Sequence, residues 1–218
     1  MDRKFVWFGI HSELSELEAL QAFLKEGFVG WGWVGTGDLR HLIDRDWTEV
    51  KKEIKKRIWE YYKQIPWFSK EFGETFEEFD KSADKSFSDS GGNFKSFEYL
   101  LHKEKRIKPG DIVAIRRGNR IYAIGLAISD YEYNEKLRDL DLSHGVRVKW
   151  LVFNKDLSPI GTASTNKLPP IRYIQKDKPL IVDILKKHFN VSTDKELDIM
   201  LQEILKEVLS ARKFRRED

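Results

Sequence analysis

Residues 111–128 read DIVAIRRGNRIYAIGLAI and carry the clearest strand signal in the chain. Apolar, largely β-branched side chains fill 112–115 and 121–128, and a short Arg-Gly-Asn segment at 117–119 separates them. Two such runs joined by a tight turn that contains Gly predict a β-hairpin. Gly125 inside the second run indicates close packing or a bend in that strand.

Further strands and helices are predicted on both sides of this hairpin. Apolar residues alternate with Arg147 and Lys149 over 146–152, which is typical of a half-buried strand. The segment 66–93 is the least regular stretch and is interpreted as an insertion with short helices. The chain is therefore predicted to be α+β. The remaining predictions are strands at 5–10 and 171–174, and helices at 17–24, 48–63, 94–101, 180–189 and 194–212.

Composition bounds the possible functions. The chain has 218 residues, 40% of them hydrophobic, which is enough for a sizeable core. Lys plus Arg exceed Asp plus Glu by 39 − 36, so the net charge is only +3. The absence of Cys excludes disulfide scaffolds, thiolate zinc sites and cysteine nucleophiles. Five scattered His form no metal cluster, so neither a metal nor a cofactor is expected.

The start of the chain lacks the apolar length and cleavage site of a secretory signal, and no apolar run approaches the roughly 20 residues of a membrane span. We therefore expect a cytoplasmic protein with no membrane partner. Its 34% charged residues and two Met resemble the composition of proteins from hot environments.

No catalytic motif is evident. The Gly-rich segment 30–37 has no Lys where a phosphate-binding loop requires one, and two Trp fill positions where a dinucleotide site needs open backbone amides. Asp130 and Glu132 lack the following Lys of a nuclease motif. The sequence thus predicts a binding module and not an enzyme, with no catalytic residues.

Two Trp between glycines form the first candidate site. Trp31 and Trp33 lie in a run where large rings alternate with Gly, and rings on such turns can sandwich a flat base or a methylated group. On an extended segment the two rings would point to opposite sides, so one can be core and the other ligand-facing. The alternative is that both are core anchors.

Two Tyr and two cations form the second candidate site. Tyr131 and Tyr133 come at the end of a predicted strand, where a ring could complete an aromatic cage. Arg147 and Lys149 on the following strand could meet phosphates. The alternative is cross-strand packing for the Tyr and a solvated face for the cations, and for Arg147 and Lys149 taken singly that alternative is favoured.

Positive charge at the hairpin forms the third candidate. Arg116, Arg117 and Arg120 flank its turn, and Lys residues and one Arg precede it at 103–108. A hairpin tip with three Arg suits contact with a nucleic-acid backbone. Charge runs are more often solvated faces, and only the nearby hairpin sets this one apart.

Five motifs follow one another along the chain: GWGWVGTGDL at 30–39, IKPGDIV at 107–113, IYAIGLA at 121–127, DYEY at 130–133 and RVKWL at 147–151. Taken together, they resemble the EVE/YTH-like branch of the PUA-related folds over about residues 4–175. That resemblance implies a small twisted β-barrel of about five to six strands flanked by helices, which reads modified bases in nucleic acids.

The resemblance also implies roles for particular residues. A base is taken out of its stack and held in an aromatic cage, with Trp31 or Trp33 as the first ring and Tyr131 or Tyr133 as the second. Polar contacts to the base edge come from the end of the first strand. Here that position holds His11, Ser12 and Glu13, without the Asn residues familiar in the family.

Among DNA-directed relatives the arrangement is similar to the N-terminal domain of archaeal McrB-type subunits of modification-dependent restriction systems. That similarity implies methylated double-stranded DNA as ligand, an AAA+ GTPase domain in the full-length chain and a separate nuclease subunit. Residues 1–178 would then form the recognition domain, and 179–218 a C-terminal helical extension or linker toward the motor.

We therefore expect a non-catalytic reader of methylated DNA that flips N6-methyladenine, or secondly methylcytosine, into its cage. Backbone contacts would come from Arg116, Arg117 and Arg120, with Arg147 and Lys149. Two alternatives stay open. One is an RNA-binding module that reads modified or single-stranded RNA, and the other is a protein-interaction domain whose Trp are all core and whose last helix mediates assembly.

Overall fold

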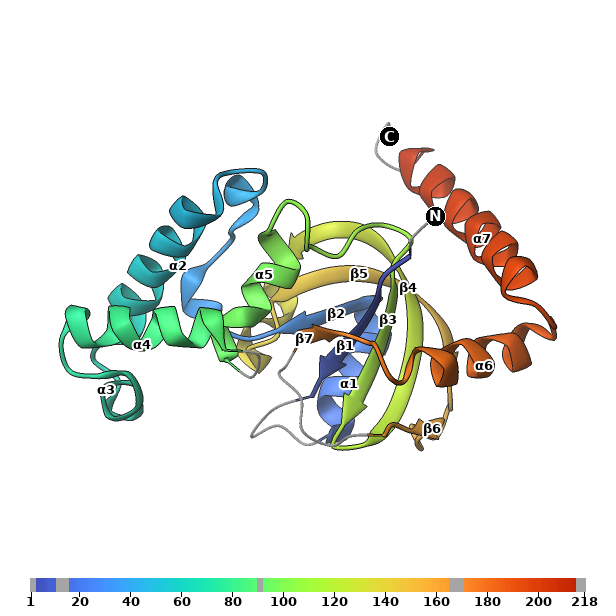
Figure 1. The fold of residues 1–218 in the computed structure, drawn as a ribbon, viewed down its shortest axis with the longest axis horizontal. Helices are drawn as coiled ribbons and strands as arrows, with labels where there is room; N and C mark the ends of the chain where they lie inside the picture. The colour runs from blue at the N-terminus through green and yellow to red at the C-terminus, as the bar shows by residue number, and fades with distance from the viewer. Residues whose placement is uncertain (1–2, 11–15, 90–91, 165–170, 215–218) are drawn as a thin grey trace.

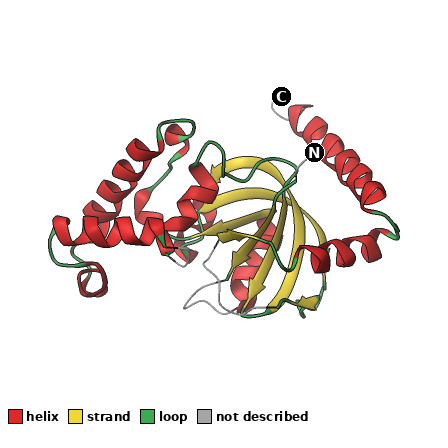
Figure 2. Ribbon diagram, viewed as in Figure 1, coloured by secondary structure: helices red, strands yellow, loops and turns green. Residues whose placement is uncertain are grey.

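The computed structural model describes residues 3–10, 16–89, 92–164 and 171–214. One bent sheet lies at the centre, with helices against both of its faces (Figures 1 and 2). The prediction of mixed helices and strands is confirmed. The strands are β1 (Phe5–Gly9), β2 (Phe28–Trp31), β3 (Ile112–Arg117), β4 (Arg120–Tyr133), β5 (His144–Phe153), β6 (Gly161–Thr162) and β7 (Ile171–Tyr173).

The helices gather in three places. Helix α1 covers the sheet, α2 to α4 project to one side as a helical lobe, and α6 and α7 lie at the other side (Figure 1). The α-helices are α1 (Glu16–Glu26), α2 (Trp47–Tyr62), α3 (Pro66–Phe72), α4 (Phe76–Ser88), α5 (Ser96–Leu101), α6 (Lys178–Phe189) and α7 (Asp194–Phe214). Short 3₁₀ turns are η1 (Val34–Thr36), η2 (Arg40–Leu42), η3 (Asn93–Lys95) and η4 (Glu135–Leu140).

The hairpin expected at 111–128 is confirmed as the antiparallel pair β3 and β4. Arg117 pairs with Arg120 at its tip, and Gly118 between them has a φ of +56°. Gly125 lies where β4 packs closely on β5, because a Cβ there would come within 2.2 Å of the Val148 side chain. The sequence therefore located both the turn and the close approach.

The sheet is open in the described residues, so the expected barrel of five to six strands is not what the hydrogen-bonded ladder shows. Seven strands follow the order β2-β5-β4-β3-β1-β7, with β6 on β4. β7 pairs antiparallel with the free edge of β1, and β2 forms the other end of the ladder. Register shifts in β4, at 124–125 and 127–131, bend the sheet without closing it.

Both faces of the central strands are buried. In β1, Val6 and Phe8 join the core shared with α1 and the helical lobe, whereas Phe5 and Trp7 join the core beneath α6 and α7. A strand covered on both faces is apolar throughout and does not alternate with polar residues. This explains the compact apolar run near the start of the chain.

The helical lobe contains most of the segment 66–93 that the sequence left irregular. Asp46 caps α2 by accepting the Thr48 N–H, and Thr75 with Glu78 forms a capping box at the start of α4. Phe68 and Phe79 are fully buried against one another. The segment is therefore two helices, α3 and α4, of which α4 begins with a capping box, and their aromatic side chains belong to the core shared with the sheet.

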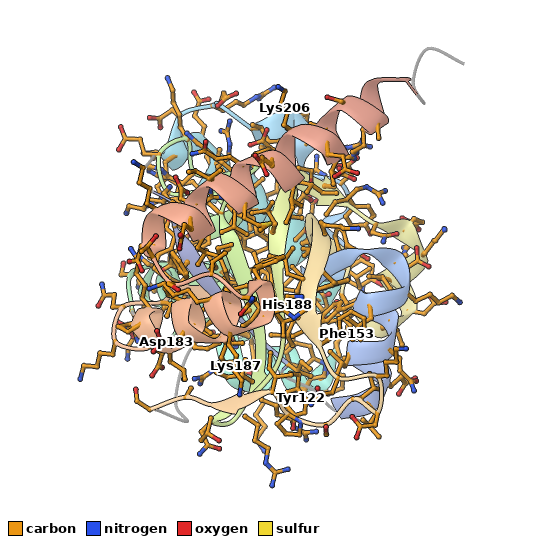
Figure 3. All side chains as sticks on the ribbon, turned by 90° about the vertical axis from the view of Figure 1, so that its right-hand side faces the viewer. Tyr122, Phe153, Asp183, Lys187, His188 and Lys206 are labelled. Carbon is orange, nitrogen blue, oxygen red and sulfur yellow. The ribbon has the colours of Figure 1, made fainter. Side chains whose placement is uncertain are left out.

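The last two helices cover a face of the sheet. Ile181 and Leu185 of α6 and Leu197 and Leu201 of α7 are buried in the same core as β1 and β3. Figure 3 looks onto this face, where α7 crosses the strands beside α6. The predicted domain boundary at 178 lies at the start of α6, yet α6 and α7 pack against the sheet and share its core. Among the helices of the described residues, none combines the length and the apolar composition of a transmembrane span.

Candidate functional site

The structure brings three of the four predicted rings together around one histidine. Trp31 and Tyr133 both pair with His144 across neighbouring strands, and Tyr131 stacks on its imidazole with ring centroids 6.0 Å apart. Trp31 and Tyr131 are buried, and Trp31 packs edge-on against Phe97 at 4.8 Å. Tyr133 lines a pocket that opens beside the Trp-rich turn, which comprises residues 31–39, whereas Tyr131 lines a different hollow, between β4 and α7.

Trp33 points elsewhere, into the helical lobe. Its φ of +67° is uncommon for a residue other than Gly, and it turns the chain out of β2. The centroid of its indole lies 4.8 Å from that of the Phe94 ring and 5.2 Å from that of the Tyr62 ring, and the residue is only 9% exposed. The Asp141 carboxylate holds the turn by accepting the N–H of Val34 at 2.8 Å. Trp33 is thus a core anchor, the alternative that the sequence left open.

A buried hydrogen-bond network holds the Trp-rich turn on the sheet. The Tyr131 hydroxyl accepts the Leu39 N–H at 3.3 Å and lies 2.8 Å from Nδ1 of His144. Nε2 of His144 lies 2.9 Å from the Thr36 hydroxyl and 3.2 Å from the Trp33 carbonyl. Complete burial lowers the pKa of His144 to about 4, so the imidazole is neutral at pH 7. The pattern fits a proton on Nε2 and a Tyr131 hydroxyl that donates to Nδ1.

An open pocket of about 480 Å³ lies on the outer side of this turn. The Tyr61 ring, from the last turn of α2 and 49% exposed, lines it together with Tyr133 from the end of β4. Gly35 lets the turn approach Tyr61, since a Cβ there would lie 2.3 Å from the ring. Gly37 also lines the pocket, with open space where its Cβ would be.

Charges of both signs surround the pocket. Asp38 forms an ion pair with Arg40, and Glu135 forms one with Arg138 at 2.9 Å. Partial burial acts to raise the pKa of Asp38, but hydrogen bonds from Arg40 outweigh it and hold that pKa below its usual value. The lining therefore combines two rings with two neutralised pairs, which suits a flat, uncharged polar group.

The predicted cations of the hairpin do not reach this pocket. Arg116 is only 3% exposed, and its guanidinium lies 5.5 Å from the centre of the Trp7 ring. The prediction that Arg116 contacts a nucleic-acid backbone is therefore wrong. Arg117 and Arg120 are exposed at the hairpin tip, where β4 begins, whereas Tyr133 ends that strand. His11, Ser12 and Glu13 lie outside the described residues.

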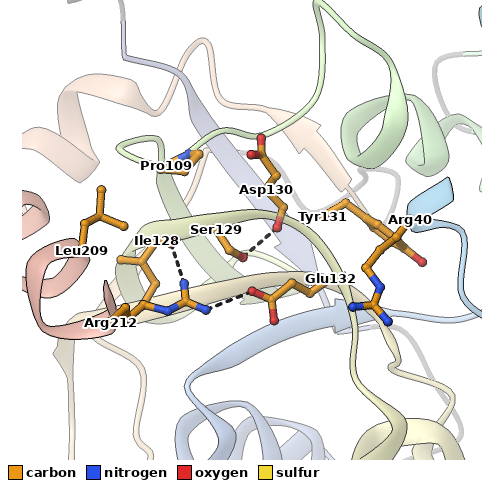
Figure 4. Close-up of a pocket in the computed structure, with 9 residues that line it drawn as sticks. All are labelled: Arg40, Pro109, Ile128, Ser129, Asp130, Tyr131, Glu132, Leu209 and Arg212. Atoms are coloured by element: carbon orange, nitrogen blue, oxygen red, sulfur yellow. Dashed lines mark hydrogen bonds and ion pairs between the residues drawn. The ribbon is translucent and has the colours of Figure 1, made fainter. Parts of the chain in front are cut away.

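A second hollow, of about 500 Å³, lies between β4 and α7, and Glu132 is one of its lining residues (Figure 4). The Glu132 carboxylate there pairs with Arg147 at 2.7 Å and with Arg212 at 3.2 Å. Arg212 also donates to the Ile128 carbonyl at 2.8 Å and so ties α7 to the irregular part of β4. Arg147 is thus engaged in a structural ion pair, while Lys149 is exposed.

Sequence reasoning missed three residues of this region. His144 and Thr36 form the network, and Tyr61 lines the pocket. The only signal for His144 is a single His before Gly at the start of a predicted strand. Tyr61 reads as one of the apolar positions of a helix, which gives no reason to expect half of it exposed.

Among the described residues, no group of three or more His, Cys, Asp or Glu could hold a metal ion. No curated protein and no solved structure matches the chain. A family model described as a domain of unknown function, DUF8426, matches residues 9–169, which is well over half of the chain and spans β2 to β6 with the helical lobe. The chain therefore belongs to the DUF8426 family.

Proposed function

We propose that this protein is a non-catalytic reader of methylated DNA, which holds a base flipped out of the duplex in the pocket lined by Tyr61 and Tyr133. The observation that carries the proposal is this pocket, where rings from two elements far apart in the chain lie beside the Trp-rich turn. Its volume of about 480 Å³ lies within the usual range of ligand pockets. Stacking on such rings is worth about 1–3 kcal/mol per base.

The proposal changes the membership of the cage expected from the sequence. Tyr133 is retained, Tyr61 takes the place of a Trp as the second ring, and Trp31, Trp33 and Tyr131 are buried residues that do not line the pocket. The paired charges on the rim offer hydrogen-bonding groups to the base edge. A reader of this kind requires only a local basic surface, which is compatible with a net charge of +3.

The bent sheet with helices on both faces is compatible with an EVE/YTH-like, PUA-related fold, and we propose that relationship. In that setting the chain is the targeting domain of a McrB-type GTP-dependent restriction complex, and its partners are an AAA+ GTPase domain and a nuclease subunit. N6-methyladenine is the first candidate base and methylcytosine the second, because a cage of rings senses a methyl group mainly by shape and dispersion.

The test compares binding of the full chain to duplexes that are unmodified or carry N6-methyladenine or methylcytosine. The wild type is expected to prefer one methylated duplex. Tyr61→Ala should reduce that preference about tenfold, because one stacking face is lost, and Tyr133→Ala should do the same. Phe153→Ala is the matched control, since Phe153 is also a half-exposed ring, on β5, and does not line the pocket.

Three outcomes would overturn the proposal. Equal affinity for methylated and unmethylated duplexes removes the modified-base reader. Tighter binding to RNA of the same sequence favours the RNA-binding alternative. Nucleic-acid binding no stronger than a weak, salt-sensitive background favours the protein-interaction alternative.

A further inference from the structure

The lysines of α2 are of two kinds: one forms ion pairs with α4, and others are exposed to solvent. Lys55 points toward α4, where it lies 2.6 Å from Asp80 and 3.0 Å from Asp84, and its side chain is 11% exposed. Lys52 and Lys56, one turn apart, lie on the outer face of the helix and are exposed. Helix geometry therefore leaves two Lys of the segment directed toward solvent.

These two lysines line a hollow of about 650 Å³ together with Arg45 and His41. Neither Lys52 nor Arg45 takes part in an ion pair in the described part of the chain, and Lys56 has only Glu60 at 3.9 Å. Two carboxylates, Glu49 and Glu53, also line the hollow. Glu53 forms an ion pair with Arg57 at 2.7 Å, so Glu49 is the carboxylate left to balance the cations of the hollow.

The hollow adjoins the pocket proposed for the base. Arg40 lines the pocket, and the next residue, His41, lines the hollow. Arg57 braces the wall between them, because its guanidinium donates to the Thr36 carbonyl at 3.0 Å and lies 3.2 Å from Nε2 of His41. The hairpin tip, by contrast, lies at the far end of β4 from Tyr133.

We infer that the outer face of α2, with Lys52, Lys56 and Arg45, binds the phosphate backbone of the DNA strand that carries the flipped base. The inference rests on the proposed function and locates its backbone contacts on α2, away from the hairpin of Arg117 and Arg120. Charge complementarity supports this occupant, because each cation that neutralises a phosphate releases condensed counterions. The half-exposed Phe76 supplies an apolar part of the wall.

The test uses two matched charge reversals in the full chain, K52E/K56E on α2 and R117E/R120E at the hairpin. Each replaces two exposed cations by two acids, so an effect of net charge alone would weaken binding equally in both. We expect K52E/K56E to weaken binding of methylated and unmethylated duplexes alike, by about tenfold or more, and to reduce the salt slope by about 2. R117E/R120E should change either affinity by less than about twofold.

The inference and the proposed function fail in distinguishable ways. If the wild type prefers the methylated duplex but K52E/K56E stays within about twofold of it, or R117E/R120E weakens binding as much or more, the α2 surface is wrong and the reader stands. If the wild type shows no preference for a methylated duplex, the proposed function fails whatever the variants do. Circular dichroism spectra and urea midpoints that match the wild type confirm that both variants are folded.

Discussion

The two ends of β4 contrast in how deeply the structure buries their side chains. At the end of the strand, Tyr131 and Tyr133 pack on His144, whose two ring nitrogens hold the Trp-rich turn. At its start, the hairpin tip exposes Arg117 and Arg120, and Gly118 faces open space. The rings of the expected cage and the hairpin arginines expected to contact the nucleic-acid backbone therefore lie at opposite ends of a strand of 14 residues.

The largest expected difference between the two ends is in stability. Trp33→Ala should lower the free energy of unfolding by about 3–5 kcal/mol, because it leaves a cavity among Tyr62, Phe72 and Phe94. Arg117→Ala at the exposed tip should change it by less than about 0.5 kcal/mol. Urea unfolding followed by fluorescence measures both. A cost for Trp33→Ala below about 1 kcal/mol would contradict the buried position of this ring.

This expectation also affects how binding data are interpreted. A loss of methyl preference in Trp33→Ala can arise from a disordered lobe as well as from a lost cage ring. Tyr61→Ala separates the two effects, because Tyr61 is half exposed and lines the pocket.

The second difference concerns pH and belongs to the His144 end. The pKa of His144 is about 4 in the folded chain and 6.5 as a reference value, so between these pH values the unfolded chain binds a proton that the folded chain does not. Stability from this group is complete above pH 6.5 and is lost as the pH falls toward 4, by about 3 kcal/mol in total.

The measurement compares unfolding of the wild type and His144→Phe from pH 7 to pH 4.5. The variant is less stable at pH 7, because the Tyr131 hydroxyl and the Thr36 hydroxyl each lose one of their hydrogen-bond partners. Its stability should nevertheless fall less steeply with decreasing pH than that of the wild type. Parallel curves would show that His144 is not held neutral by burial.

The two ends should differ least in the stability cost of replacing a glycine. Gly37 near the Trp-rich turn and Gly118 at the hairpin tip have φ values of +63° and +56°, and at neither would an added Cβ meet a heavy atom within 4 Å. Substitution by Ala should therefore cost only the local backbone strain, about 1 kcal/mol at each position. A much larger cost at Gly37 alone, by thermal or urea unfolding, would show that the pocket side of the turn is tighter than its geometry indicates.

Much of the local structure follows from the sequence. The hairpin was located by its apolar runs and its turn, and α2 at 47–62 and α6 at 178–189 lie within a few residues of the predicted helices. Helices α3 and α4 were not predicted individually, because Gly73 lies between them and α3 has only 7 residues. Closure of the sheet was not predictable either, because it depends on which strands become edges.

The site was only partly predictable. The sequence indicated that rings gather near the Trp-rich turn and near Tyr133, and the structure brings these segments together. It did not indicate that Trp33 turns away, since a positive φ at a Trp has no sequence signal. Nor did it indicate Tyr61, which has the same apolar spacing as its buried neighbour Tyr62.

Periodicity and turn residues act over short distances, so the amino-acid sequence is enough to specify the class of elements, the hairpin, the number of aromatic rings and the lack of thiol chemistry. Which ring is buried, which ring lines the pocket and which Lys of α2 is paired are settled by packing. Those outcomes depend on contacts between segments far apart in the chain, such as Trp33 with Phe94 and Lys55 with Asp84. Burial and ion pairing are properties of these contacts, so the same residue type takes opposite roles at adjacent positions.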